Sequence, residues 1–547
     1  MERKSRGWNN TESPVRNTVC RINRNPELVK AESRMTMLTH RTSALVIIAC
    51  IAATLSVHAQ IRMPVCFTDD MILQRNAPVA IWGDAAPESE ITITFAGQTA
   101  KTNADKNGEW RTSLKPMSAN STPQVLRISS TLDSKTLELK NVLVGEVWLA
   151  GGQSNMGFPL RSHKDWKKHL PSKPNPAIRI LQIPVTEFGE INRRHLKWRI
   201  YDKASTPNFS AVAYFFVTEL QKRLKIPVGI IGSYRGGTWN ENWMTPESIK
   251  NEPKLKYLFD KYDKEYGKFK DHAAYETAYQ DFLVKVKEWE AKGGWSSGNR
   301  PMAPLGPKAY QRPSGLYECM IKPLQPYSIK GVIWYQGEGN SWRYDEFRTL
   351  FPAFIKGWRK TWGNPKLPFY FVQLPPFNAK QWPHFRQAQL DCARAIPNCG
   401  MVVSEGCGDL KDIHPKVKKP IGIRLANAVC VEEYGQPGPA YGPMCKSVRQ
   451  KGNKLVVAFD HVGSGLVCKG PKLGSFEIAG KDKAFVKADV SIVGDTIEVS
   501  SKGLAEPETV RYAYAAFPVM DLFNKEGLPA SPFTVTLHDT TGSTLTP

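Results

Sequence analysis

The chain has 547 residues, of which 41% are hydrophobic and 23% charged, a composition typical of ordinary globular proteins. Its formal net charge is +23 at pH 7, which favours acidic partners and anionic surfaces. The lysines and arginines are scattered along the chain rather than clustered, and this pattern argues against a nucleic acid partner.

The N-terminal 59 residues have the pattern of a leader. The apolar stretch 43–57 is too short to span a bilayer comfortably and reads as a signal-peptide h-region. Val57-His58-Ala59 supplies a small-x-small cleavage site. We therefore expect residues 1–59 to be removed, leaving an exported protein, periplasmic or secreted, without a membrane span. An N-terminal membrane anchor is the alternative.

Eight cysteines follow the leader, from Cys66 to Cys468, and none of them forms a Cys-x-x-Cys pair. This spacing excludes zinc-ribbon and thioredoxin-like sites. Disulfide bonds are compatible with export, but the spacing does not indicate a pairing.

Short alternating apolar runs occupy residues 61–140, and Asn107-Gly108 stands where a hairpin turn would precede Trp110. The pattern predicts an N-terminal β-sandwich domain over residues 60–140.

A different pattern begins at Val142, where nearly continuous apolar runs end in glycine or polar residues and alternate with helical stretches such as 211–224 and 345–362. We expect five such runs to be buried parallel strands: 142–150, 228–233, 329–335, 369–374 and 400–403. Residues 141–434 are therefore predicted to form a doubly wound α/β sheet, in which ligands bind beyond the carboxyl ends of the strands.

Two segments depart from this pattern. Residues 251–294 are rich in Lys, Glu and Tyr and predict an inserted helical hairpin, either a lid or substrate wall or a solvated excursion. After a Gly- and Pro-rich break at 435–443, strand-like runs predict a β-rich region over 444–547.

Ser154 is a candidate nucleophile. It follows the 142–150 strand in a glycine-rich turn, where backbone N–H groups can face a bound carbonyl oxygen. A serine in such a turn is more often structural, and Met156 stands where the Gly-x-Ser-x-Gly elbow requires glycine. The assignment of Ser154 as nucleophile becomes convincing only if a base and oxyanion donors lie at the ends of other strands.

His414 is the candidate base. It lies beyond the 400–403 strand in Asp409-Leu-Lys-Asp-Ile-His414-Pro, and two carboxylates precede it, Asp412 and Asp409. Donors for an oxyanion are expected from Gly236-Gly237 after one strand and from Gln336 after another. Each glycine also has a purely structural reading as a strand-to-helix turn.

These motifs together resemble the sialate O-acetylesterase family, a branch of the SGNH hydrolases that act on O-acetylated sugars. The resemblance covers nearly all of residues 60–547, in the expected order. Its matching blocks are Gly145-Glu-Val-Trp148, Gln153-Ser-Asn-Met156, Gly236-Gly-Thr238 with Trp243, Trp334-Tyr-Gln-Gly-Glu338, Leu367 to Leu374, Asp412-Ile-His-Pro415 and Glu526 to Phe533.

The resemblance implies an SGNH-type parallel sheet with flanking β-sandwich-like regions, and no metal or organic cofactor. It implies Ser154 as nucleophile, His414 as general base, and an oxyanion hole formed by the Ser154 N–H, an N–H near Gly236 and the Gln336 amide. Many SGNH enzymes place the acid three residues before the histidine, but that residue is Lys411 here. Asp412 is therefore the first choice for the acid, Asp409 the second, and a backbone carbonyl a third.

Two further departures concern the sugar pocket rather than the chemistry. Leu316-Tyr-Glu-Cys319 replaces a usual Leu-Tyr-Asn, and Trp239-Asn-Glu-Asn-Trp243 replaces a proline-type turn with Glu-Ala-Trp. The resemblance implies a carbohydrate O-acetylesterase whose partner is an O-acetylated glycan, sialate first. Acetylxylan or another plant polysaccharide is the alternative substrate, and a non-catalytic glycan-binding protein is the alternative of another class.

Overall fold

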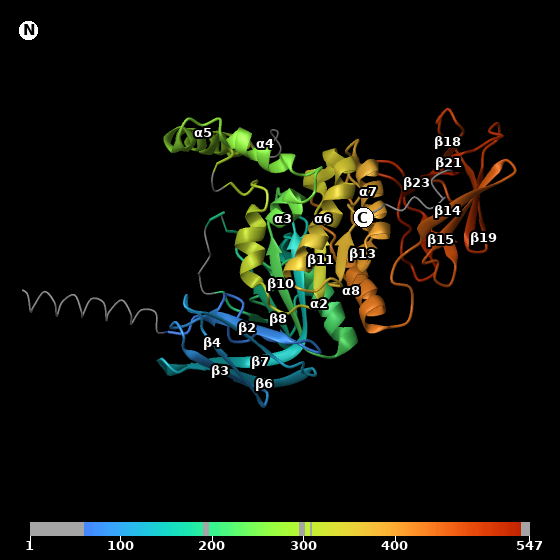
Figure 1. Ribbon diagram of the computed structural model, residues 1–547. Coiled ribbons are helices and arrows are strands. Elements are labelled where there is room, and N and C mark those ends of the chain that lie inside the picture. Colours follow the sequence, from blue (N-terminus) through green and yellow to red (C-terminus); the bar gives the residue numbers. More distant parts are fainter. Residues whose placement is uncertain (1–59, 187, 190–195, 295–300, 307–308, 538–547) are drawn as a thin grey trace, which may run out of the picture. The chain divides into compact units, whose positions relative to one another are not determined.

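The computed structural model describes residues 60–186, 188–189, 196–294, 301–306 and 309–537 (Figure 1). The predicted leader, residues 1–59, lies outside the described residues. The description below concerns the compact unit Ile61–Pro547. None of the helices described in these ranges is both long enough and apolar enough to cross a membrane.

A parallel sheet forms the centre of this unit, and this confirms the predicted α/β fold (Figure 1). Its strands lie in the order β13-β12-β11-β7-β10-β8, and β9 pairs antiparallel with β8 at the edge. The bounds are β7 Asp133–Gly152, β8 Asn175–Gln182, β9 Arg199–Tyr201, β10 Val228–Tyr234, β11 Gly331–Tyr335, β12 Phe369–Val372 and β13 Cys399–Val402. Every residue of β10, β11 and β12 is buried, as expected for strands covered on both faces.

The strand order changes direction at β7. The chain leaves β7 for β8, returns to β10 beside β7, and then crosses to β11 on the other side of β7. At such a switch point the loops after neighbouring strands diverge and leave a crevice beyond their carboxyl ends. The end of β7 is therefore the position at which this fold favours a ligand.

Helices cover both faces of the sheet. Alternate residues of a strand point to opposite faces, so Trp148 and Gly151 of β7 face opposite sides. The ring centres of Trp148 and Phe216 of α2 are 5.5 Å apart on one face. Trp334 of β11 is paired with Gly151 and therefore points to the other face, where its ring centre lies 4.8 Å from that of Phe354 of α6. The helices are α2 Ala211–Leu224, α3 Pro246–Lys250, α4 Tyr257–Tyr266, α5 His272–Ala291, α6 Tyr344–Thr361, α7 Trp382–Ala395 and α8 Lys419–Tyr434, with short turns η3 Asn240–Trp243 and η7 Glu338–Arg343.

β7 also belongs to the N-terminal strands. Its first half pairs antiparallel with β6 and its middle pairs parallel with β1, so the strand runs unbroken through residue 140. The N-terminal strands are β1 Ile72–Gln74, β2 Val79–Asp84, β3 Glu90–Phe95, β4 Gln98–Asn103, β5 Glu109–Leu114 and β6 Asn120–Ser130. The turn predicted at Asn107-Gly108 is present, since the Gly108 N–H donates to the Asp105 carbonyl at 2.9 Å, but the hairpin is wrong. The two strands that the turn joins, β4 and β5, pair with β3 and β2 instead.

Residues after Tyr441 form antiparallel ladders. One sheet has the order β14-β15-β20-β19, a second has the order β18-β17-β21-β23, and β16 pairs with β22. Their bounds are β14 Met444–Lys451, β15 Lys454–Asp460, β16 Leu466–Cys468, β17 Phe476–Ala479, β18 Val486–Lys487, β19 Asp489–Val493, β20 Thr496–Ser500, β21 Thr509–Tyr512, β22 Leu522–Asn524 and β23 Phe533–Thr536. Gln373, just after β12, donates to Ser531 Oγ at 3.0 Å and so ties these strands to the central sheet.

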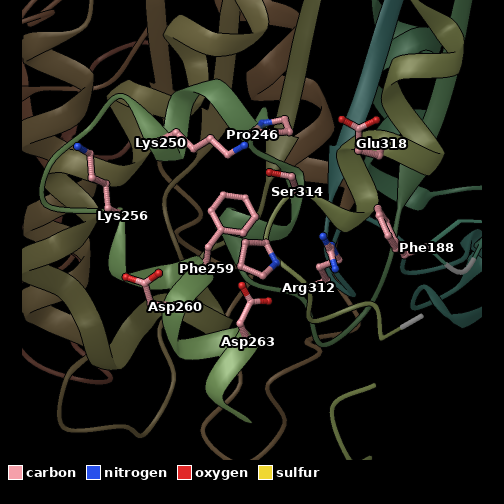
Figure 2. Close-up of a pocket in the computed structure, with 11 residues that line it drawn as sticks. Phe188, Pro246, Lys250, Lys256, Phe259, Asp260, Asp263, Arg312, Ser314 and Glu318 are labelled. Atoms are coloured by element: carbon pink, nitrogen blue, oxygen red, sulfur yellow. The ribbon is translucent and has the colours of Figure 1, made fainter. Parts of the chain in front are cut away.

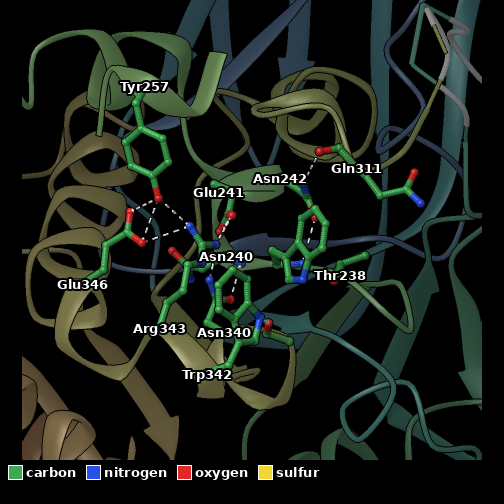
Figure 3. A network of polar contacts seen from close by, with 12 residues as sticks. Thr238, Asn240, Glu241, Asn242, Tyr257, Gln311, Asn340, Trp342, Arg343 and Glu346 are labelled. Atoms are coloured by element: carbon green, nitrogen blue, oxygen red, sulfur yellow. Dashed lines mark hydrogen bonds and ion pairs between the residues drawn. The ribbon is translucent and has the colours of Figure 1, made fainter. Parts of the chain in front are cut away.

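The inserted segment is helical, as its pattern predicts, and consists of α4 and α5. A polar network fixes α4 against the α/β region (Figure 3). The Tyr257 hydroxyl of α4 donates to the Glu346 carboxylate at 2.8 Å, and Arg343 donates to the Tyr257 oxygen at 3.1 Å. Arg343 also pairs with Glu241, and the two side chains are only 10% and 4% exposed.

Arg343→Met is expected to lower the free energy of unfolding by about 3–5 kcal/mol, because it leaves the Glu241 carboxylate buried without its counter-ion. Arg343→Met combined with Glu241→Gln is expected to recover part of that loss. Arg127→Met is the matched control, since the Arg127–Glu138 pair is 52% and 39% exposed and should contribute less than about 1 kcal/mol. Urea unfolding measures all three. Equal losses for Arg343→Met and Arg127→Met would contradict the role given to the buried pair.

Candidate active site

Ser154 lies just beyond the carboxyl end of β7. Gly152 has φ +139°, and a Cβ there would lie 2.1 Å from the Tyr335 carbonyl oxygen, so only glycine fits at this bend. The next side chain, Gln153, accepts hydrogen bonds through its Oε1 from the N–H groups of Gly337 and Gly339, at 3.4 and 3.2 Å. The turn that carries Ser154 is thereby fixed to the loop after β11.

His414 meets Ser154 across 260 residues of sequence, with 2.8 Å between His414 Nε2 and Ser154 Oγ. It lies in the loop between β13 and α8. Two Asx-type turns build this loop: Asp409 Oδ1 accepts from the N–H groups of Lys411 and Asp412, and Asp412 Oδ1 accepts from the His414 N–H at 2.8 Å.

The two candidate acids differ in their position relative to the imidazole. Asp412 Oδ1 lies 3.9 Å from His414 Nδ1, beyond hydrogen-bond distance, and both side chains are close to half exposed. The Asp409 carboxylate is occupied by the amides of its own turn. Of the two, Asp412 is the carboxylate that lies beside the His414 ring.

Burial lowers the pKa of the His414 imidazole. The negative charge of Asp412 opposes this shift, and the positive charge of Lys418 adds to it. The imidazole is therefore neutral at pH 7, and in the tautomer protonated at Nδ1 its Nε2 can accept the proton of the Ser154 hydroxyl.

The backbone around Ser154 offers free donors. A methyl group on Gly236 would lie 3.2 Å from Ser154 Cβ, so the two backbones are in close contact. Within the residues that the structure describes, the N–H groups of Ser154, Gly236 and Gly237 donate to no intramolecular acceptor. Unpaired N–H groups beside a candidate nucleophile are what an oxyanion hole requires.

The Gln336 amide, the third predicted donor, is already engaged. Its Nε2 donates to Asn340 Oδ1 at 2.7 Å and to the Thr238 carbonyl at 3.3 Å. Asn340 in turn accepts from the Asn240 N–H and donates to the Glu241 carboxylate, so neither amide can be reversed without losing hydrogen bonds. An oxyanion would have to compete with the longer of the two Gln336 bonds.

A buried network behind Ser154 was given no role by the sequence analysis. Asn155, which is fully buried, donates from Nδ2 to Glu338 Oε1 at 2.5 Å and to the Ile413 carbonyl at 3.0 Å. Lys418, also fully buried, donates to Asn155 Oδ1 at 2.5 Å. The residue after Ser154 thus holds the carbonyl of the residue before His414.

The two charges of this network are removed from water. Burial lowers the pKa of the Lys418 ammonium to about 8, and the nearby Glu338 carboxylate opposes that shift. Burial also raises the pKa of the Glu338 carboxyl group. Asn155 and Glu338 lie within the blocks of the family resemblance, whereas Lys418 follows Lys416 in a lysine-rich stretch that reads as solvated surface.

Known proteins similar to this chain are carbohydrate esterases. Residues 301–431 match the family model for carbohydrate esterase, sialic acid-specific acetylesterase. The chain is 28% identical over 426 residues to the sialate O-acetylesterase of Rattus norvegicus and 27% identical over 435 residues to that of Homo sapiens, covering 74% of each and 69% and 71% of this chain. The solved structure of a carbohydrate acetylesterase from Xanthomonas citri is similar with a TM-score of 0.73 and 32% identity, over 87% of this chain and 99% of that one.

Lys418→Met is expected to change how stability depends on pH. Between about pH 8 and 10.5 the unfolded chain holds a proton on Lys418 that the folded chain has released, so this group makes the free energy of unfolding rise with pH over that window. The variant should lack this rise, which is of the order of 3 kcal/mol. Urea unfolding at pH 7 and pH 10 measures it, with the exposed Lys416→Met as control. A variant that keeps the whole wild-type rise would contradict the burial of a titrating Lys418.

Proposed function

Because the chain belongs to the sialic acid-specific acetylesterase family of carbohydrate esterases, we propose that Ser154 and His414 are its nucleophile and general base. The enzyme is a carbohydrate O-acetylesterase. The observation that carries the assignment of the two residues is the 2.8 Å contact between Ser154 Oγ and His414 Nε2 at the switch point of the parallel sheet.

In the proposed first step, His414 Nε2 takes the proton of the Ser154 hydroxyl as Oγ attacks the carbonyl carbon of the acetyl ester. The tetrahedral oxyanion is held by the N–H groups of Ser154 and Gly236, and by Gln336 when its bond to the Thr238 carbonyl gives way. His414 then gives its proton to the departing sugar oxygen. This leaves an acetyl-enzyme.

In the second step, His414 takes a proton from water as the water oxygen attacks the acetyl carbon. Collapse of that intermediate releases acetate and returns the proton to Ser154 Oγ. Asp412 acts as the acid partner by attracting the imidazolium that forms in both steps. At 3.9 Å and with half its surface exposed, its contribution is modest.

Asn155 serves this pair as a positioning residue. Its Nδ2 donates to the Ile413 carbonyl, so the backbone on either side of the Ser154–His414 contact is joined by one buried amide. Glu338 and Lys418 hold the two ends of that amide. A buried side chain that holds the backbone therefore supports the alignment of nucleophile and base. The position three residues before His414, where many SGNH enzymes have an acid, is lysine in this chain.

We propose O-acetylated sialic acid in a glycan as the substrate. The names of the rat and human relatives support this choice. The excess of lysine and arginine over acidic residues, which persists without residues 1–59, also favours an acidic sugar. The strand order supports an SGNH-type sheet within a catalytic domain at 141–434. We further propose flanking β-sandwich-like regions at 60–140 and 444–547, and export directed by the leader at 1–59.

Ser154→Ala and His414→Ala are each expected to lower the turnover of a chromogenic acetyl ester by at least about 10³-fold, since each removes one member of a pair that acts as a unit. The exposed Ser162→Ala and His272→Ala are the matched controls and should keep wild-type rates. Near-wild-type turnover in either folded test variant rejects the proposed roles. Acetate release from an O-acetylated sialoside and from acetylxylan, measured in parallel, tests the substrate: no release from the sialoside rejects sialate.

The acid limb of the kcat/KM profile is expected below pH 6.5, because burial lowers the pKa of His414 and protonation removes the base. Asp412→Asn removes the charge that favours the protonated imidazole, so the pKa of His414 falls further and the limb moves to lower pH. The asparagine oxygen can still accept the His414 N–H, which preserves the loop. The exposed Asp165→Asn is the control. A limb that stays in place or moves to higher pH speaks against Asp412 as the acid partner.

A further inference from the structure

A cavity of about 710 Å³ lies beside the helical insertion, and none of the residues proposed for catalysis lines it (Figure 2). Its size is that of a small-molecule site. We propose that it is a glycan subsite, which binds a sugar residue next to the acetylated one. This inference rests on the proposed function, because it assigns the rest of the same substrate.

One side of the cavity presents Arg312 in a fixed position. Its guanidinium carbon lies 4.4 Å above the ring centre of Phe188 (Figure 2). It also lies 5.5 Å from the ring centre of Tyr262 on α4. A guanidinium held between two aromatic rings is partly desolvated and loses little conformational freedom on binding. It offers several N–H donors to the hydroxyl or carboxylate oxygens of a sugar.

The opposite side is formed by α4, with Phe259, Asp260 and Asp263 (Figure 2). The two aspartates are three residues apart and share one face of the helix. No cation of the described residues lies within ion-pair distance of either carboxylate. Both are therefore free to accept hydrogen bonds from sugar hydroxyls, while the Phe259 ring gives an apolar surface for the C–H groups of a sugar.

Ser314 lines the cavity between these two sides, and its hydroxyl is unsatisfied. The residue is only 3% exposed, and within the described residues its Oγ has no hydrogen-bond partner. Its φ of +63° is unusual for a residue with a side chain, and its N–H is held by the Glu241 carbonyl at 2.8 Å. The oxygen itself has almost no accessible surface, so Ser314 shapes the cavity between the two sides rather than offering its hydroxyl to a ligand.

One chain segment borders both the cavity and the catalytic residues. The Tyr310 hydroxyl would lie 3.7 Å from a methyl group on Gly237, next to the Gly236 backbone that contacts Ser154. Arg312 follows two residues later, a backbone distance of about 7 Å. Asn242 fixes the segment by donating to the Gln311 and Arg312 carbonyls at 2.9 and 3.3 Å. This segment therefore places the cavity next to the catalytic residues, as a subsite for the neighbouring sugar residue requires.

The wall formed by α4 is rigid enough for this role. Tyr257, in its first turn, is held by Glu346 and Arg343, and Arg343 is paired in turn with the buried Glu241 (Figure 3). Asn242 stands where the family pattern has alanine, and its amide fixes the segment that carries Arg312. That departure secures the Arg312 side of the cavity, and the fixed position of α4 favours the substrate-wall interpretation of the insertion.

Calorimetric titration of sialyl-lactose, and separately of a xylo-oligosaccharide, into full-length Ser154→Ala protein tests the subsite without requiring turnover. Adding Phe259→Ala or Asp260→Asn to Ser154→Ala is expected to raise the Kd of the glycan that binds by about tenfold, the effect of losing one good contact. Asp260→Asn alters an exposed side chain and preserves the fold. Asp281→Asn, exposed on α5, and Phe517→Ala, exposed near the C-terminus, are the matched controls.

An unchanged Kd in both cavity variants overturns the subsite. The subsite is also overturned if neither of the two glycans binds. If the wild-type protein lacks esterase activity while glycan binding to Ser154→Ala protein still depends on the cavity, the subsite stands and the proposed function is rejected. Cavity-dependent binding of the xylo-oligosaccharide alone keeps the subsite and rejects sialate as the substrate.

Discussion

Parallel pairing of β7 with both β10 and β11 is the constraint on which the site depends. Because the three strands run in one direction, the loops after them start at the same edge of the sheet, and a change of strand order such as that at β7 is where folds of this kind bind ligands. Ser154 follows β7, Gly236 follows β10 and Gln336 follows β11. The loop after β13 reaches the same edge and brings His414 to within 2.8 Å of Ser154. Residues separated by 260 positions therefore meet as a consequence of strand direction.

A second constraint is the burial of charge behind that edge. Lys418 and Glu338 are removed from water, which disfavours both ions, and their mutual attraction offsets only part of that cost. The structure retains them with Asn155 between them, and that amide also holds the loop of His414. This arrangement explains how the imidazole keeps its place although the nearest acid, Asp412, is 3.9 Å away. The buried pair lowers the stability of the fold, and in return two distant loops are held in alignment.

The features that depend on local pattern were predictable from the sequence. Continuous apolar runs predicted five of the six parallel strands of the central sheet and missed β8, and glycine-rich turns predicted the positions of Ser154 and Gly236. The Asn107-Gly108 turn was misread as a hairpin because a turn motif does not specify which strands pair across it. The engagement of Gln336 was not predictable, since it depends on Asn340 and Glu241 through tertiary contacts. Lys418 was missed because a lysine within Lys416-Val-Lys-Lys419 has the pattern of solvated surface, and only the fold buries it.

Covalent labelling shows directly whether Ser154 is the nucleophile. A fluorophosphonate reagent phosphonylates activated serines and leaves a stable adduct that mass spectrometry of peptides can locate. If Ser154 is the nucleophile, esterase activity falls in proportion to an adduct on Ser154, and an acetylated sugar slows the labelling. Loss of activity with the adduct on another serine, or full activity after Ser154 is completely labelled, would contradict it.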